Sequence, residues 1–176
     1  TMEDVNVDMF YGEHGPTPKQ AEFRDNPARY KLFGGAVGGG KTWTICAEAL
    51  RLGMIYPGNR GFLCRHEGEA FRKTTLVTLL SLAEQIRSST GHNLIVSHNK
   101  SEKELTLVTG STIIYAGIGD PDASTRIQSL EIGYFGVDEA TETKKDSISM
   151  LKARLRWKLP NKTHPAFFGL FASNPG

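Results

Sequence analysis

The chain has 176 residues, 39% of them hydrophobic and 23% charged, and a formal net charge of +2. This composition is typical of a globular domain with one hydrophobic core, and it neither requires nor excludes a nucleic-acid partner. No apolar run approaches the ~18 residues of a membrane span, and the acidic start lacks a signal-peptide pattern. We therefore expect a cytoplasmic protein with no membrane partner.

The first predicted helix follows an irregular lead-in over residues 1–18. Thr17 is a suitable N-cap, and Pro18 suits the first helical position. Gln20 lies on this helix, shortly before the next apolar run. Its side-chain amide can both donate to and accept from the edge of an adenine. We therefore predict an adenine contact for Gln20; the alternative is a solvent-facing helix glutamine.

A glycine-rich loop connects the apolar run at residues 30–33 to a helical pattern at residues 43–50. From Gly35 to Thr42 the sequence reads G-x-x-x-x-G-K-T, the pattern of a phosphate-binding P-loop. Its glycines let backbone N–H groups approach an anion, and the helix start adds further N–H groups. The loop glycines are Gly35, Gly38, Gly39 and Gly40. Lys41 can reach the β- and γ-phosphates and Thr42 can bind Mg²⁺, whereas the alternative is a glycine-rich turn without a ligand.

Candidate strands and helices alternate along the rest of the chain. Strands are predicted at residues 60–64, 94–96, 105–108, 112–115, 134–137 and 167–172, and those at 105–108 and 112–115 form a β-hairpin around Thr-Gly-Ser. Helices are predicted at residues 68–90, ended by Gly91, and in a late segment that includes residues 150–156. Residues 117–129 are a loop or short helix. Cys46 and Cys64 lie in apolar runs and are predicted to be buried free thiols.

This alternation predicts the α/β fold of a P-loop NTPase, a mainly parallel central sheet with helices on both faces and a β-hairpin addition. We see no linker and predict one ATPase domain over residues 1–176. Ligands of such sheets bind at the carboxyl ends of the strands. Three predicted strands end in polar residues that could meet there: the P-loop, Asp138 with Glu139, and Ser173 with Asn174.

The acidic pair at the end of the run at residues 134–137 indicates the type of reaction. Asp138 would hold Mg²⁺ beside Thr42, and Glu139 would orient and deprotonate an attacking water. A switch GTPase or a nucleotide kinase does not need such a second carboxylate, so the pair favours a hydrolytic ATPase with ATP and Mg²⁺ as cofactors. The alternative is a pair of capping residues for the next helix.

Hydrolysis also needs positive charge near the γ-phosphate in the transition state. We predict Arg126, in the loop before the acidic strand, as an arginine finger that serves a neighbouring subunit. Four other arginines are available: Arg65, Arg72, Arg154 and Arg156. The alternative for each of the five is a surface arginine or one that flanks the sheet.

Together these motifs resemble the N-terminal ATPase domain of tailed-bacteriophage terminase large subunits, which are DNA-packaging motors. The matching segments follow the family's order over nearly the whole chain. They are Thr17 to Gln20, Gly35 to Thr42, Arg65, Gly117 to Pro121, Val137 to Ala140, Arg154 to Arg156 and Ser173 to Pro175. The P-loop and the acidic strand occur in many ATPases, whereas Gly-x-x-Asp-Pro, Arg-Leu-Arg and Ser-Asn-Pro together are more specific.

The resemblance implies partners and further roles. It implies that Ser173 and Asn174 sense the γ-phosphate and couple hydrolysis to the movement of double-stranded DNA. It also implies a homo-oligomeric ring on the portal protein of a procapsid, a terminase small subunit as partner, and action in the cytoplasm of an infected bacterial host.

Two features depart from the family's pattern. Family members often carry an arginine in the phosphate loop, whereas residues 36–39 here are Ala-Val-Gly-Gly, which increases the importance of Arg126. The family's ATPase domain also continues into a lid segment and a nuclease domain. We therefore expect a truncated ATPase domain, to which no nuclease activity is assigned.

Three other interpretations remain open. A helicase-like P-loop ATPase would show further helicase motifs in a second motor domain. A regulatory nucleotide switch is suggested weakly by Asn-Lys-Ser-Glu at residues 99–102, which is similar to a guanine-recognition motif but precedes the acidic strand. A structural ring component would bind nucleotide without turnover.

Overall fold

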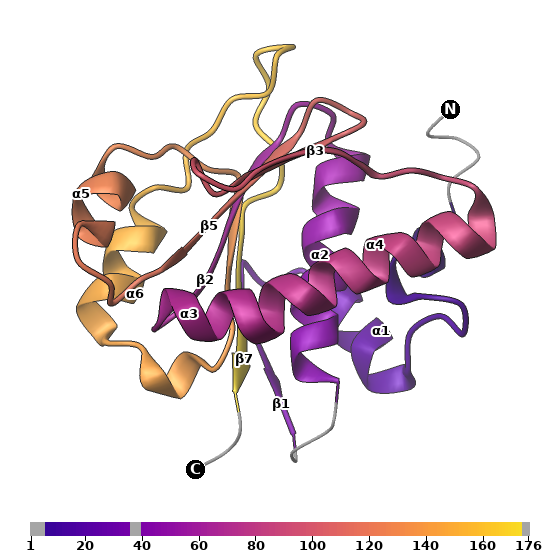
Figure 1. Cartoon of the computed structure of the whole chain (residues 1–176), viewed down its shortest axis with the longest axis horizontal. Coiled ribbons are helices and arrows are strands. Elements are labelled where there is room, and N and C mark those ends of the chain that lie inside the picture. The colour runs from indigo at the N-terminus through magenta and orange to yellow at the C-terminus, as the bar shows by residue number, and fades with distance from the viewer. Residues whose placement is uncertain (1–5, 36–39, 174–176) are drawn as a thin grey trace.

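A twisted sheet with helices on both faces forms the body of the molecule (Figure 1). The computed structural model describes residues 6–35 and 40–173. Within them the strands are β1 (Tyr30–Gly34), β2 (Arg60–Arg65), β3 (Ile95–Asn99), β4 (Glu104–Leu107), β5 (Thr112–Gly117), β6 (Tyr134–Val137) and β7 (Phe168–Ser173). The α-helices are α1 (Pro18–Asp25), α2 (Lys41–Ile55), α3 (Gly68–Ala70), α4 (Leu76–Thr90), α5 (Ala123–Gln128) and α6 (Lys145–Lys152).

The strand order is β1-β7-β6-β2-β5-β4-β3. The first five strands in this order are parallel to their neighbours, while β4 pairs antiparallel with both β5 and β3. The predicted mainly parallel sheet with a hairpin addition is therefore confirmed. The hairpin predicted at residues 105–108 and 112–115 is β4–β5, and β3 extends it by one more antiparallel strand.

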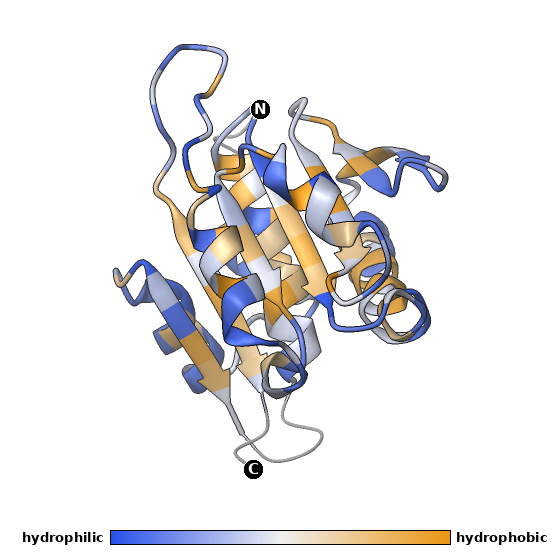
Figure 2. Cartoon of the chain, turned by 90° about the vertical axis from the view of Figure 1, so that its left-hand side faces the viewer, coloured by the Kyte–Doolittle hydropathy of each residue, from blue (hydrophilic) through white to orange (hydrophobic). Residues whose placement is uncertain are grey.

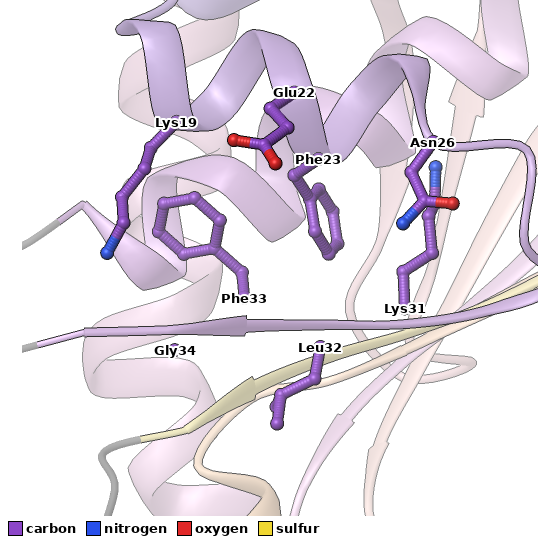
Figure 3. A pocket seen from close by; sticks show the side chains of 8 residues that line it. All are labelled: Lys19, Glu22, Phe23, Asn26, Lys31, Leu32, Phe33 and Gly34. Atoms are coloured by element: carbon purple, nitrogen blue, oxygen red, sulfur yellow. The ribbon is translucent and has the colours of Figure 1, made fainter.

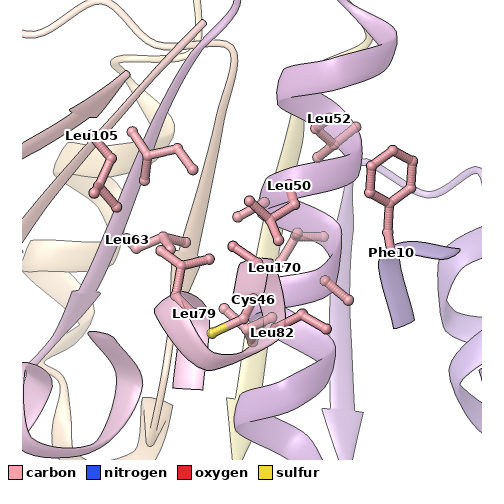
Figure 4. Packing of buried hydrophobic residues seen from close by; sticks show 14 of the residues in the cluster. Phe10, Cys46, Leu50, Leu52, Leu63, Leu79, Leu82, Leu105 and Leu170 are labelled. Atoms are coloured by element: carbon pink, nitrogen blue, oxygen red, sulfur yellow. The ribbon is translucent and has the colours of Figure 1, made fainter. Parts of the chain in front are cut away.

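Two hydrophobic clusters cover the two faces of the sheet. One lies between the strands and α2 and α4, and Figure 4 shows leucines from both strands and helices in it, with Cys46 among them. The other lies beneath α5 and α6 on the opposite face, and Figure 2 shows the central strands as largely hydrophobic behind these helices. Cys46 and Cys64 are buried free thiols as predicted, and burial raises the pKa of both. Among the described residues, no helix is long and apolar enough to cross a membrane.

The N-terminus of α1 has the predicted cap. The Thr17 hydroxyl accepts from the Gln20 backbone N–H, the Gln20 side chain accepts from the Thr17 N–H, and Pro18 occupies the first turn. This reciprocal capping box satisfies two backbone donors that would otherwise lack partners. Thr17 followed by Pro18 was therefore sufficient to predict where this helix begins.

The helix predicted at residues 68–90 is present but is not uniform. Its middle, Phe71–Thr75, is a π-helical turn between α3 and α4, in which the Leu76 N–H donates to the Phe71 carbonyl. Gly91 ends α4 in a left-handed conformation with φ of 82°, as predicted. A π turn contains one residue more than an α turn, so it changes which side chains face the sheet.

The late helix is shorter than predicted. We expected it to carry Arg154, Leu155 and Arg156, but α6 ends at Lys152. Leu155 instead forms a parallel bridge with Ile132 and packs in the second hydrophobic cluster. Tertiary burial of Leu155 in extended backbone therefore overrides the helical periodicity. Both arginines lie outside α6: Arg154 donates to the Gln128 carbonyl at the end of α5, and Arg156 pairs with Glu131.

A buried ionic cluster attaches the N-terminal segment to α2. The Glu48 carboxylate is fully buried and accepts two hydrogen bonds from Arg51, at 2.9 and 2.7 Å. It also accepts one from the Tyr11 hydroxyl at 2.7 Å, and Tyr11 belongs to the 3₁₀ segment Val7–Tyr11. Burial, and then the neighbouring carboxylate, raise the pKa of Tyr11. The charge on Glu48 is thus compensated within the fold.

Candidate functional site at the carboxyl ends of the strands

Three strands that precede the predicted site residues are neighbours in the sheet. β7 lies between β1 and β6, Gly34 pairs with Ser173, and Val137 pairs with Phe171. Their carboxyl ends therefore lie side by side at one edge, as predicted for the P-loop, the acidic pair and Ser173. Gly38, Gly39 and Asn174 lie outside the described residues.

The Asp138 carboxylate is the most constrained group at this edge. It is 2% exposed. Its Oδ2 accepts from the Thr42 hydroxyl at 2.9 Å and from the Thr75 hydroxyl at 2.6 Å, and its Oδ1 accepts from the Glu139 N–H at 3.1 Å. Thr42 lies in the first turn of α2, so the Thr42–Asp138 hydrogen bond joins this helix to the acidic strand.

None of these three donors carries a charge. Among the described residues, no arginine forms an ion pair with Asp138. A buried carboxylate without a charged partner is unfavourable unless a cation is present. Mg²⁺ binds few protein oxygens and takes its other ligands from water and phosphate, so Thr42 and Asp138 fit it by chemistry. No group of three or more His, Cys, Asp and Glu side chains that could hold a metal ion occurs in the described part of the chain.

Glu139 follows Asp138 in a left-handed backbone conformation, with φ of 50° and ψ of 56°. Such a conformation is uncommon for a residue other than glycine, and strained residues of this kind concentrate at functional sites. Its carboxylate forms no hydrogen bond with any described residue, and the side chain is half-buried. The site therefore places an acceptor beside Asp138.

The P-loop lysine lies against its own loop. Lys41 is 8% exposed, and its ammonium donates to the Gly35 carbonyl at 3.2 Å. Gly40 is the N-cap of α2 with φ of 77°, and a Cβ there would lie 3.2 Å from the Gln20 amide nitrogen. Both conditions favour glycine at this position. The described end of the loop thus has the backbone geometry that its sequence predicts.

Gln20 is buried rather than solvent-facing. Its oxygen accepts from the Thr17 N–H, and its nitrogen donates to the Thr44 hydroxyl on α2 at 3.0 Å. Gln20 therefore connects α1 to the P-loop helix. One amide hydrogen and one lone pair remain for a ligand, and the adenine contact stays a prediction.

A pocket of about 200 Å³ lies between α1 and β1, next to Gly34 (Figure 3). The rings of Phe23 and Phe33 pack edge to face there, with ring centroids 5.5 Å apart. Leu32 points away from α1, to the other side of β1. Gln20 does not line this pocket, although its neighbour Lys19 does.

Two of the candidate arginines have different partners in the fold. Arg65, at the end of β2, donates to Glu142 and to the Thr74 hydroxyl. Its pKa is raised, mainly by the Glu142 hydrogen bond and in smaller part by the charges of Asp138 and Glu139. Arg126 lies on α5 and donates to the carbonyls of Tyr115 and Glu102, beside β5 and the β3–β4 turn. Arg126 is therefore not next to Asp138 in its own subunit.

The segment at residues 99–102, which is similar to a guanine-recognition motif, forms a turn. Asn99 accepts from the Ser101 hydroxyl and the Glu102 N–H, so it shapes the β3–β4 turn instead of presenting a base-recognition edge.

Thr75 was missed by sequence reasoning, although it donates the shorter of the two hydroxyl hydrogen bonds to Asp138. A threonine in the middle of a predicted helix gives no distinct signal.

The parallel sheet, the glycine loop at a helix start and the adjacent acidic strand end define an α/β domain with the P-loop NTPase fold. A sequence model of one family, described as terminase large subunit, T4likevirus-type, N-terminal, matches residues 32–175. The chain therefore belongs to this family of phage terminase large subunits. No curated protein sequence matches the chain.

Solved structures of large terminases share the fold. The large terminase from a thermophilic bacteriophage has a TM-score of 0.70 at 14% identity, over 90% of this chain and 39% of that chain. The complex of the same terminase with ADP gives 0.67 at 14% identity, with the same coverage of 90% and 39%. The large terminase ATPase domain of Thermus phage P74-26 gives 0.60 at 14% identity, over 96% of this chain and 85% of that chain. The chain thus spans about 39% of the length of the first of these terminases.

Proposed function

We propose that residues 1–176 are the ATPase domain of a DNA-packaging motor, which hydrolyses ATP with Mg²⁺ to move double-stranded viral DNA into a procapsid. The single observation that carries the proposal is the buried Asp138 carboxylate, whose hydroxyl and N–H donors carry no charge. Thr42 and Asp138 would hold Mg²⁺, which supplies charge stabilisation to the phosphates. The complex of a structurally similar large terminase with ADP supports a nucleotide ligand.

Each residue at the edge has a proposed role in hydrolysis. Lys41 and the N–H groups at the start of α2 bind the phosphates. Glu139 accepts a proton from the attacking water as the water oxygen bonds to the γ-phosphorus and the bond to the ADP oxygen breaks. Ser173, next to Gly34 in the sheet, senses the γ-phosphate together with Asn174. Gln20 contributes to adenine binding.

The wider assembly is also proposed from the family. Terminase large subunits of this kind would act as a homo-oligomeric ring on the portal protein, with a small subunit, in the cytoplasm of the infected host. Because the phosphate loop contains no arginine and Arg126 lies away from Asp138, Arg126 is proposed to serve a neighbouring subunit.

The activity is tested by measuring phosphate release with ATP or GTP, in the presence of Mg²⁺ or EDTA. We expect Mg²⁺-dependent ATP hydrolysis, its loss in Lys41→Ala, and retained ATP binding without turnover in Glu139→Gln. Lys145→Ala, which removes an exposed lysine on α6, is the matched control and should keep the parent rate. A parent rate in Glu139→Gln would show that Glu139 is not the base, and a preference for GTP would contradict the ATPase assignment.

The trans role of Arg126 is tested by the dependence of the rate on protein concentration. An arginine supplied by a neighbour accelerates hydrolysis by about 10³–10⁵-fold. The rate per subunit should therefore rise with concentration in the parent and stay low in Arg126→Ala. A rate that is independent of concentration and insensitive to this substitution would contradict the proposal.

A further inference from the structure

Thr75 contacts Asp138 from an element outside the P-loop and the acidic strand. Its side chain is fully buried, and its hydroxyl donates to Asp138 Oδ2 at 2.6 Å. The same oxygen accepts from the Thr42 hydroxyl at 2.9 Å. The two hydroxyls therefore share one carboxylate oxygen, and they come from residues 33 positions apart in the sequence.

The π turn Phe71–Thr75 sets the direction of this hydroxyl. The Leu76 N–H donates to the Phe71 carbonyl, five residues back, so the turn holds one more residue than an α turn. Phe71 and Thr75 are both fully buried, and Phe71 stacks on Tyr115 with ring centroids 5.3 Å apart. In a regular α-helix, one residue fewer would rotate α3 by about 100° relative to α4. The extra residue lets the Phe71 stacking and the Thr75 hydrogen bond form together.

The neighbouring Thr74 does not contact Asp138, so this hydrogen bond is specific to Thr75. The Thr74 hydroxyl donates to the Ala70 carbonyl at 2.6 Å within its own helix and accepts from Arg65 at 3.0 Å. Threonine hydroxyls in helices commonly bond back to the carbonyl four residues earlier. Thr75 does not do so; its hydroxyl is directed out of the helix to the carboxylate.

We propose that Thr75 is a positioning residue that holds the Asp138 carboxylate ready for Mg²⁺. This inference rests on the proposed function. Thr42 and Asp138 would hold the metal, so the Thr42 hydroxyl would have to serve both as a metal ligand and as a donor to Oδ2. Thr75 keeps its hydrogen bond, so the carboxylate retains its orientation while Oδ1 remains fixed by the Glu139 N–H. Hydrogen-bond partners of metal ligands typically change metal affinity by about 10–100-fold when they are removed.

The experiment measures binding of a fluorescent N-methylanthraniloyl ADP to the full chain, in Mg²⁺ and in EDTA, without turnover. Thr75→Val removes the hydroxyl at nearly constant volume, and Thr75→Ser restores it. Thr78→Val is the matched control, because the Thr78 hydroxyl donates only to the Thr74 carbonyl of its own helix. Should Thr75→Val not fold, Thr75→Ala removes the same hydroxyl with less steric demand, and binding in EDTA reports on folding.

We expect Thr75→Val to bind the probe like the parent in EDTA and to need about 10–100-fold more Mg²⁺ for tight binding. Thr75→Ser and Thr78→Val should behave like the parent. An unchanged Mg²⁺ requirement in Thr75→Val, or no rescue by serine, would overturn the role of Thr75 alone. A parent protein that binds the probe equally with and without Mg²⁺ would overturn the proposed function as well.

Discussion

Two buried carboxylates, one on α2 and one beside it, differ in the charge of their hydrogen-bond donors. Glu48 is 0% exposed and accepts hydrogen bonds from the Arg51 guanidinium and the Tyr11 hydroxyl. The positive charge of Arg51 therefore balances the charge of Glu48. Asp138 is 2% exposed and accepts hydrogen bonds from two threonine hydroxyls and a backbone N–H, none of which is charged. The first arrangement includes a cation of the fold itself, whereas the hydrogen-bond donors of the second are all uncharged.

Under the proposed function, this difference distinguishes a carboxylate that stabilises the fold from one that binds a ligand, without reference to any motif. Removing one partner of a buried ion pair leaves an uncompensated charge and destabilises the fold. Removing the charge of a carboxylate whose donors are uncharged removes a cost from the folded state. Under the proposed function it would also remove a ligand of Mg²⁺. Substitutions at Glu48 should therefore affect unfolding, and substitutions at Asp138 should affect turnover.

The largest effect is expected for Asp138→Asn. Loss of a carboxylate ligand to Mg²⁺ should lower the rate of ATP hydrolysis by on the order of 10³-fold, since metal stabilisation contributes several kcal/mol. The melting temperature without nucleotide or metal should stay the same or rise, because the buried charge is gone. Phosphate release and a thermal melt measure the two effects. A melting temperature well below that of the parent would place Asp138 with Glu48 as a structural group.

A smaller effect, on stability instead of turnover, is expected for Glu48→Gln. It leaves Arg51 and Tyr11 without their charged partner and should reduce the free energy of unfolding by about 3 kcal/mol. Urea denaturation measures this change. Glu84→Gln is the matched control, because Glu84 and Arg87 form the same i,i+3 pair on the exposed surface of α4. We expect no measurable change there, and equal losses in the two variants would contradict the importance of burial.

Tyr11→Phe should have a smaller effect again. It removes one hydrogen bond to Glu48 and leaves the Arg51 pair in place, so we expect a loss of about 2 kcal/mol in unfolding free energy. The Phe ring keeps the packing of the Val7–Tyr11 segment. Combining Tyr11→Phe with Glu48→Gln in a double-mutant cycle should give a loss well below the sum of the two single losses. Additive losses would show that the hydroxyl acts independently of Glu48.

The smallest effect concerns the two buried thiols. Burial, and in smaller part the negative charge of Asp138, raise the pKa of Cys46 and Cys64. The reactive thiolate is therefore scarce in the folded protein, and iodoacetamide should label neither cysteine at about pH 8 unless denaturant is added. Asp138→Asn should not change this result, because burial is the main cause. Rapid labelling of the native protein would contradict it.

The parts of the fold set by local sequence were predictable. Three short-range signals were sufficient: the N-cap Thr17 before Pro18, the glycine loop before α2 and the apolar run before Asp138. The structure contains the helix or strand that each predicts. The neighbouring strand ends were predictable as well, because a parallel sheet brings its carboxyl ends to one edge.

The parts set by tertiary context were not predictable. Helical spacing continued through residues 150–156, but burial of Leu155 against Ile132 ended α6 earlier. The π turn could not be recognised, because the apolar pattern around its extra residue still resembles that of an α-helix. The hydrogen bond from Thr75 to Asp138 could therefore not be inferred. Glu48 appeared in the sequence only as one polar position in an apolar helix, since its partner Tyr11 lies 37 residues away.

The backbone of Glu139 has a consequence for the evolution of this domain. At φ of 50° and ψ of 56°, any residue with a Cβ is disfavoured by about 1 kcal/mol or more relative to glycine. A library screened for heat resistance should therefore enrich Glu139→Gly, while a library screened for turnover should retain glutamate. The two screens therefore favour different amino acids at position 139. Comparing the residues that each screen enriches there would test the role of Glu139 without a structure.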